Sequence, residues 1–143
     1  MDLKAALMSD RGTTWRQLVW TDQPLSFWGG FDPVSGRVVD VHHPLSGRTL
    51  TGAILAMPAG RGSSTGSVVL LEALLLGTAP AGLIWSQLDA VLAIGVLVAD
   101  EMFERTLPWA VVDPQDFPVL ARCAEIALDP TGWVRTGRSA EEA

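Results

Sequence analysis

The chain has 143 residues, of which 48% are hydrophobic and 18% charged, and its formal net charge is −6. This composition excludes a mainly disordered chain, because the apolar side chains suffice for the core of one domain. The acidic balance and the lack of a basic cluster in the sequence also argue against nucleic acid as a partner, since phosphate affinity comes from grouped Lys and Arg.

The first 14 residues follow no hydrophobic period, and we expect residues 1–14 to form a flexible N-terminal segment. Strands are expected further along, where apolar residues alternate or run together over a few positions. These stretches are 17–20, 37–41, 50–57, 83–85, 109–112, 125–128 and 133–134. Between the first two, residues 25–31 are aromatic and rich in turn formers, and Asp32 to Gly36 have the composition of a tight turn.

Two central segments are expected to be helices. The run Val68 to Leu76 has helical length, and Gly77 follows it where a glycine commonly ends a helix. Residues 89–103 are ambiguous between a buried helix and a strand, but their length favours a helix with Asp89 as its N-cap. Short strands around two central helices predict a mixed α/β sandwich over residues 15–135, followed by a disordered tail over 136–143.

A loop rich in glycine and hydroxyl groups, Gly60 to Ser67, precedes the first of these helices; we call it the hydroxyl loop. Its glycines allow close approach of the backbone to a ligand. We expect the loop to bring Ser63 and Ser64 to a helix N-terminus, where N–H groups and the helix dipole favour a carboxylate or phosphate. The alternative is a turn that only caps the helix, which is the more common role of such sequences.

The hydroxyl loop does not match the standard nucleotide-binding motifs. Gly60 and Gly66 are one residue too far apart for a P-loop, and Ser67 stands where its lysine would follow. Thr65 occupies the third glycine position of the dinucleotide-binding fingerprint. A general anion site is compatible with both departures.

Neither a membrane-spanning helix nor an iron–sulfur site is expected in this chain. The longest apolar stretch, 90–99, is far shorter than the about 20 residues of a membrane helix, and the N-terminus lacks a signal-peptide layout, so we expect a cytoplasmic protein. The single Cys123 cannot form an internal disulfide or hold an iron–sulfur cluster, and its apolar neighbours predict a buried structural thiol. Any iron in this protein's chemistry is therefore expected on another chain.

Other chemically capable residues are expected to have structural roles. The adjacent His42 and His43 point to different sides, which favours loop histidines bonded to the backbone over metal or acid–base work. Asp32 and Asp40 are expected to fix turns. Trp28 is expected in the core or at an interface.

Four ordered blocks of the sequence resemble the small subunit of aconitase X. They are Pro24 to Pro33, Asp40 to Gly47, Pro58 to Ser67 and Asp89 to Ala99. The resemblance covers residues 24–112 and implies a swivelling β/β/α domain, equivalent to the mobile domain of aconitases. It also implies an aconitase X large subunit as partner, which holds an iron or iron–sulfur centre.

The resemblance further implies an activity and a set of site residues. In the aconitase superfamily a serine of the Gly-Ser-Ser segment acts as base, which here is Ser63. Arg61, Gly62, Ser64 and Thr65 are then expected to bind a small carboxylate substrate.

Two dehydrations are known in this family, of cis-3-hydroxy-L-proline in bacteria and of phosphomevalonate in archaea. The residues from Ser26 to Gly30 and from Arg61 to Ser64 resemble those of the bacterial type, whose product would be pyrroline-2-carboxylate. The small subunit of phosphomevalonate dehydratase is the alternative. A different class is also open, namely a non-catalytic module that binds a carboxylate or phosphate through the same loop.

Overall fold

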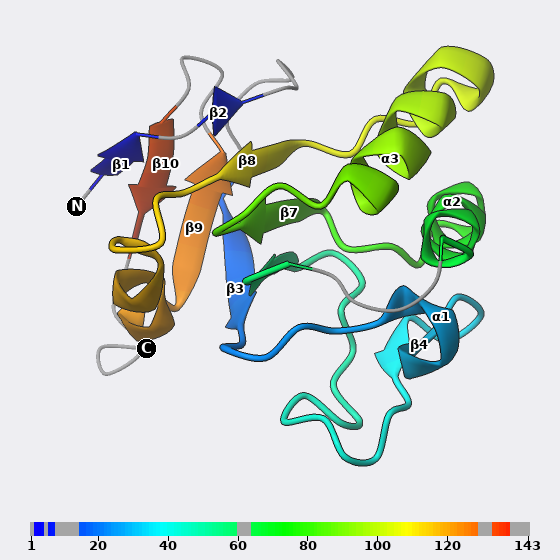
Figure 1. The fold of residues 1–143 in the computed structure, drawn as a ribbon, viewed down its shortest axis with the longest axis horizontal. Coiled ribbons are helices and arrows are strands. Elements are labelled where there is room, and N and C mark those ends of the chain that lie inside the picture. Colours follow the sequence, from blue (N-terminus) through cyan, green and yellow to red (C-terminus); the bar gives the residue numbers. More distant parts are fainter. Residues whose placement is uncertain (1, 5, 8–14, 60–63, 129–132, 138–143) are drawn as a thin grey trace.

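The computed structural model describes residues 2–4, 6–7, 15–59, 64–128 and 133–137. Its centre is an eight-stranded mixed sheet in the spatial order β1-β10-β9-β3-β6-β7-β8-β2 (Figure 1). The strands are β1 (Asp2–Lys4), β2 (Ala6–Leu7), β3 (Arg16–Trp20), β6 (Ile54–Met57), β7 (Gly82–Trp85), β8 (Trp109–Val111), β9 (Glu125–Leu128) and β10 (Trp133–Thr136). A separate two-stranded sheet joins β4 (Phe31–Asp32) to β5 (Arg37–Val38).

The sheet is parallel in its middle and antiparallel at its edges. Strands β3, β6, β7 and β8 run parallel to one another, whereas β9, β10 and β1 add antiparallel pairs on one side. At the other edge β2 pairs antiparallel with β8. Because β1 and β2 follow each other in the chain but pair with opposite edges, the sheet must curl until those edges approach.

Both long helices connect neighbouring parallel strands and lie on the same side of the sheet (Figure 1). Helix α2 (Gly66–Leu76) joins β6 to β7, and α3 (Ala90–Phe103) joins β7 to β8. The two helices pack against each other. In Figure 1, α2 is viewed nearly along its axis, whereas α3 is viewed from the side, so the two helices cross.

The central strands are buried on both faces. Leu55 and Met57 of β6 belong to the core under α2 and α3, and Ile54 and Ala56 belong to a second core on the other face. The second core also includes Phe117 from the short helix η1 (Phe117–Arg122). Burial on both faces explains why these strands read as continuous apolar runs in the sequence. No helix in the described part of the chain is long and apolar enough to span a membrane.

The predicted helix ends are confirmed where local chemistry sets them. The Asp89 carboxylate accepts a hydrogen bond of 3.0 Å from the Leu92 N–H and caps α3. Gly77 adopts φ = 79° after α2, and its N–H donates to carbonyls of the last turn. Helix α2 itself begins at Gly66, with Thr65 in the N-cap position and without a side-chain cap.

Most predicted strands are confirmed, but the strand expected at 37–41 is shorter. It stops at Val38, because the Asp40 carboxylate accepts from the His42 N–H at 3.0 Å and bends the chain. The strand expected at 50–57 begins only at Ile54, since Gly52 turns the backbone with φ = 77°.

The two ends of the chain also differ from expectation. The segment 1–14 was predicted to be flexible, but Asp2–Lys4 and Ala6–Leu7 form strands, and residues 1, 5 and 8–14 lie outside the described residues. Of the predicted tail 136–143, Thr136 ends β10, Gly137 follows it, and the remaining residues lie outside the described part.

Candidate functional site

The hydroxyl loop leaves the carboxyl end of β6, beside the carboxyl end of β7. Met57 at the end of β6 pairs with Trp85 at the end of β7. The Pro58 carbonyl then accepts hydrogen bonds from the backbone N–H of Ser86 at 3.2 Å and of Gln87 at 3.1 Å, and from the Ser86 hydroxyl at 3.1 Å. Pro58, two residues before the hydroxyl loop, is thereby fixed to the segment that leads into α3. This edge of a parallel sheet is where α/β proteins commonly bind ligands.

The end of the hydroxyl loop forms the first turn of α2. The Ser64 carbonyl accepts from the Ser67 N–H at 3.2 Å and from the Ser67 hydroxyl at 2.8 Å. The Thr65 carbonyl accepts from the N–H groups of Val68 and Val69 at 3.0 and 3.1 Å. Ser64 and Thr65 are both exposed, so two of the predicted site residues reach solvent beside a helix N-terminus.

The other predicted site residues, Arg61, Gly62 and Ser63, lie outside the described residues. The alternative that the hydroxyl loop caps α2 concerns the residue at the N-cap position. Thr65 occupies the N-cap position of α2, and its side chain makes no capping hydrogen bond. The structure therefore puts the capping position two residues after Ser63.

Gly95 lets α3 approach this turn closely, and Gly66 lies in ordinary contact distance of the short helical segment α1 (Phe27–Gly30). A Cβ atom added to Gly95 of α3 would lie 2.9 Å from the Ser67 carbonyl oxygen and 3.0 Å from the Ser67 Cβ. A Cβ on Gly66 would lie 3.7 Å from the Phe27 Cβ and 3.8 Å from the Trp28 backbone nitrogen. The start of α2 is thus held between α3 and α1.

We expect Gly95→Val to lower the free energy of unfolding by about 1–3 kcal/mol, as overpacking in a close contact does. The added side chain would meet the backbone of Ser67, so α2 and α3 would have to separate at the site. Thermal or urea unfolding of the whole chain measures the loss. The exposed neighbour Ile94→Val is the control and should stay within about 0.5 kcal/mol. Equal stability of Gly95→Val and the wild type would contradict the close contact.

Trp28 lies at the rim of the same region. Its backbone departs from helical geometry, with ψ = 111°, and Gly29 after it has φ = 82°. This bend leaves the indole exposed while the adjacent Phe27 is buried. The prediction that Trp28 lies in the core is therefore wrong. Its other predicted location, an interface, stays a prediction.

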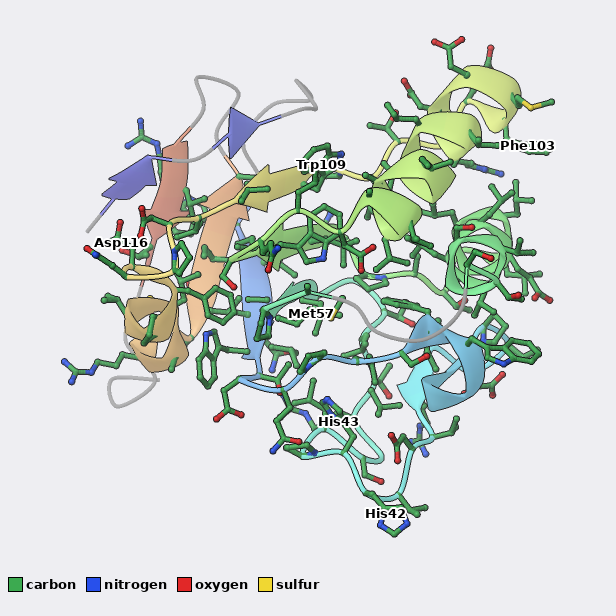
Figure 2. All side chains as sticks on the ribbon, in the orientation of Figure 1. His42, His43, Met57, Phe103, Trp109 and Asp116 are labelled. Carbon is green, nitrogen blue, oxygen red and sulfur yellow. The ribbon has the colours of Figure 1, made fainter. Side chains whose placement is uncertain are left out.

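The two histidines are not brought together at the hydroxyl loop. His43 is buried and bonded to the backbone: its Nδ1 accepts from the Leu45 N–H at 3.0 Å, so Nε2 carries the proton and donates to the Gln23 carbonyl at 3.2 Å. Figure 2 shows His42 at the outer tip of its loop, far from Met57 at the end of β6. The predicted structural role of His43 is confirmed.

The two aspartates also fix turns as predicted. The Asp32 carboxylate accepts from the Ser35 hydroxyl at 2.7 Å and the Val34 N–H at 3.0 Å, and these bonds lower the pKa of Asp32. The turn of Asp40 is the one that ends β5 early.

The described residues do not fit an iron centre. Among them, no group of three or more His, Cys, Asp or Glu side chains could hold a metal ion. Cys123 is half-buried against the second core, on the opposite face of the sheet from α2 and α3. His43 has both ring nitrogens engaged by the backbone.

Burial raises the pKa of the Cys123 thiol, which predicts a pH dependence. Alkylation by iodoacetamide follows the thiolate, so its midpoint in pH should be higher for the native chain than for the urea-unfolded chain. Because the folded-state pKa is raised, the stability linked to this thiol is present below the unfolded pKa and is lost as pH rises through the folded pKa. Equal alkylation midpoints in pH for the native and unfolded chains would contradict the raised pKa of Cys123.

The model of a family described as the aconitase X swivel domain matches residues 6–136. The chain is 54% identical over 127 residues to a cis-3-hydroxy-L-proline dehydratase of Pseudomonas aeruginosa, covering 89% of this chain and 21% of that protein. It is 45% identical over 90 residues to a phosphomevalonate dehydratase small subunit of Methanopyrus kandleri, covering 62% of this chain and 67% of that subunit.

The fold has a close counterpart among solved structures. The crystal structure of Thermococcus kodakaraensis aconitase X in its holo-form superposes with a TM-score of 0.80 at 26% identity, over 96% of this chain and 99% of that chain. The predicted resemblance and fold class are thereby confirmed. The chain spans about a fifth of the length of the two cis-3-hydroxy-L-proline dehydratases that it matches.

Proposed function

Because the chain belongs to the aconitase X swivel domain family, we propose that it is the small subunit of a hydro-lyase that dehydrates cis-3-hydroxy-L-proline to pyrroline-2-carboxylate. The observation that carries this proposal is the 54% identity over 127 residues to an enzyme of that name. The small subunit of phosphomevalonate dehydratase is the second candidate, supported by 45% identity over a shorter match of 90 residues.

The proposed enzyme needs a larger partner. The Pseudomonas relative has about four-fifths of its length outside the part that this chain matches, and the Methanopyrus relative is named a small subunit. The described residues offer no ligand set for an iron centre. We therefore assign the iron or iron–sulfur centre to the large subunit. We propose a cytoplasmic enzyme that binds neither nucleic acid nor a membrane. The net charge of −6 supports the exclusion of nucleic acid, because affinity for nucleic acid phosphates needs grouped positive charge.

The reaction removes a proton from Cα of the substrate and the hydroxyl from C3. We assign the proton transfer to Ser63, which the hydroxyl loop would hold close to the start of α2. A free serine hydroxyl is a very weak base, so its alkoxide must be stabilised by positive potential. The N-terminus of α2, the loop N–H groups and the Arg61 guanidinium are the proposed sources of that potential.

The same groups are proposed to hold the substrate carboxylate. Ser64 and Thr65 expose their side chains beside the first turn of α2, which supports a role in binding. Arg61 and the Gly62 N–H would complete this set of donors. Donors in this arrangement also stabilise the enolate-like charge that develops on the carboxylate as the Cα proton leaves.

Arg61→Ala tests the proposed carboxylate contact. Removing one charge-assisted hydrogen bond is expected to cost about 1.5–3 kcal/mol in kcat/KM of the assembled enzyme. Steady-state kinetics with cis-3-hydroxy-L-proline measure the loss, and Arg48→Ala, an exposed arginine of a different loop, serves as the control. Wild-type kinetics for Arg61→Ala would remove Arg61 from the proposed site.

The proposed substrate is tested by supplying the assembled enzyme with cis-3-hydroxy-L-proline and phosphomevalonate in parallel. Mass spectrometry detects the loss of water from either compound. We expect dehydration of cis-3-hydroxy-L-proline alone. Dehydration of phosphomevalonate alone would replace the proposal by the second candidate. Binding of a carboxylate or phosphate without turnover of either compound would favour a non-catalytic binding module.

A further inference from the structure

Helices α2 and α3 are apolar on their solvent side as well as on the side that packs on the sheet. Residues 90–99 of α3 include no polar side chain, and Glu72 is the one charged residue of α2. Six large apolar side chains within residues 68–76 of α2 and 90–99 of α3 are exposed, and we call them the helix face. They are Val68, Leu75, Leu76, Val91, Ile94 and Leu97. A helix that is apolar all round is normally buried.

The residues of the helix face are exposed although both helices also bury apolar residues in the core. Ile94 and Val68 are 60% and 59% exposed, while Ala93 and Val69, which adjoin them in sequence, are buried. Each helix therefore has a complete apolar contact with the core and a second apolar surface in addition. Contiguous exposed apolar surface of this kind marks interaction sites.

The helix face adjoins the candidate functional site. Val68 lies three residues after the N-cap Thr65, and Gly95, next to Ile94, contacts Ser67. Leu88 is also exposed, and the N–H of the preceding Gln87 donates to the carbonyl of Pro58, two residues before the hydroxyl loop. A molecule that covers the helix face would therefore extend to the loop that carries the proposed base.

We propose that the helix face is the surface on which the large subunit packs; this inference rests on the proposed function. The relatives supply the reason for this partner, because about four-fifths of the Pseudomonas dehydratase lies outside the matched domain and has to contact it somewhere. Docking here places the large subunit beside the hydroxyl loop. The partner surface is apolar, with a cationic side chain for Glu72.

The test is binding of the full chain to the large subunit, co-purified or mixed, by calorimetry. Ile94→Glu and Val68→Glu put a carboxylate into the proposed contact and should each weaken the affinity on the order of tenfold or more. Val41→Glu and Val34→Glu are matched controls, since these residues are 76% and 72% exposed in the separate region around β4 and β5. The controls should bind like the wild type. Thermal unfolding of each free variant shows that it is folded.

Every outcome decides between the alternatives. Wild-type affinity of both helix-face variants, in a complex that dehydrates its substrate, would overturn the docking surface and leave the proposed function intact. A wild-type chain that neither binds the large subunit nor supports turnover would overturn the proposed function as well. The free chain could also sediment as a dimer that Ile94→Glu converts to a monomer, while the affinity for the large subunit is unchanged. The helix face would then be the contact between two copies of this chain, and the inference would be overturned.

Discussion

Ser63→Ala is expected to lower kcat of the assembled enzyme by about 10²–10⁴-fold, the usual contribution of a positioned general base. Alanine has no oxygen to accept the Cα proton of the substrate. The variant should fold, assemble and bind substrate like the wild type, because Thr65 and not Ser63 occupies the N-cap position of α2. Steady-state kinetics and thermal unfolding of the same preparation measure both quantities.

Two further serine variants sharpen this result. Ser64→Ala is expected to be milder, since Ser64 is assigned to substrate binding. Ser46→Ala removes an exposed hydroxyl from a loop outside the site and should leave kinetics unchanged. If Ser63→Ala instead kept its turnover and lost about 1 kcal/mol of stability, the hydroxyl loop would be a helix cap and not a source of base.

The free chain is expected to show no dehydration of cis-3-hydroxy-L-proline, and addition of the large subunit should restore it. The physical reason is that expulsion of a hydroxide from C3 needs an electrophile, and residues 2–4, 6–7, 15–59, 64–128 and 133–137 include no metal-binding group that could supply one. A titration of the large subunit with this chain measures the effect. Turnover by the purified small chain alone, free of the large subunit, would contradict the two-subunit account.

The sequence predicted those elements whose signals are local. Asp89 caps α3 through its own first turn, and Gly77 ends α2 through its own φ, so neighbouring residues suffice for both. The strands β6 and β7 could be recognised because burial on both faces leaves them uniformly apolar. The shortened β5 shows the opposite case, since hydrogen bonds from the His42 and His43 N–H groups to Asp40 outweigh the alternating pattern.

Elements that depend on distant partners could not be predicted. Strands β1 and β2 are held by β10 and β8, which lie at the other end of the chain, and their short sequences carry no period of their own. The same limit applies to the candidate site. The four sequence blocks include the hydroxyl loop, but the contact of Gly95 with Ser67 arises only from the packing of α3 against α2.

Exchange of the substrate Cα proton with deuterated solvent tests the central claim most directly, because it reports proton removal without requiring loss of the hydroxyl. The assembled wild-type enzyme is expected to incorporate deuterium at Cα of recovered cis-3-hydroxy-L-proline, as measured by mass spectrometry, and Ser63→Ala is expected to do so about 10²–10⁴-fold more slowly. Exchange that persists in Ser63→Ala but disappears in Ser64→Ala would move the base to Ser64. Exchange that persists in both variants would contradict the claim that this loop takes the proton.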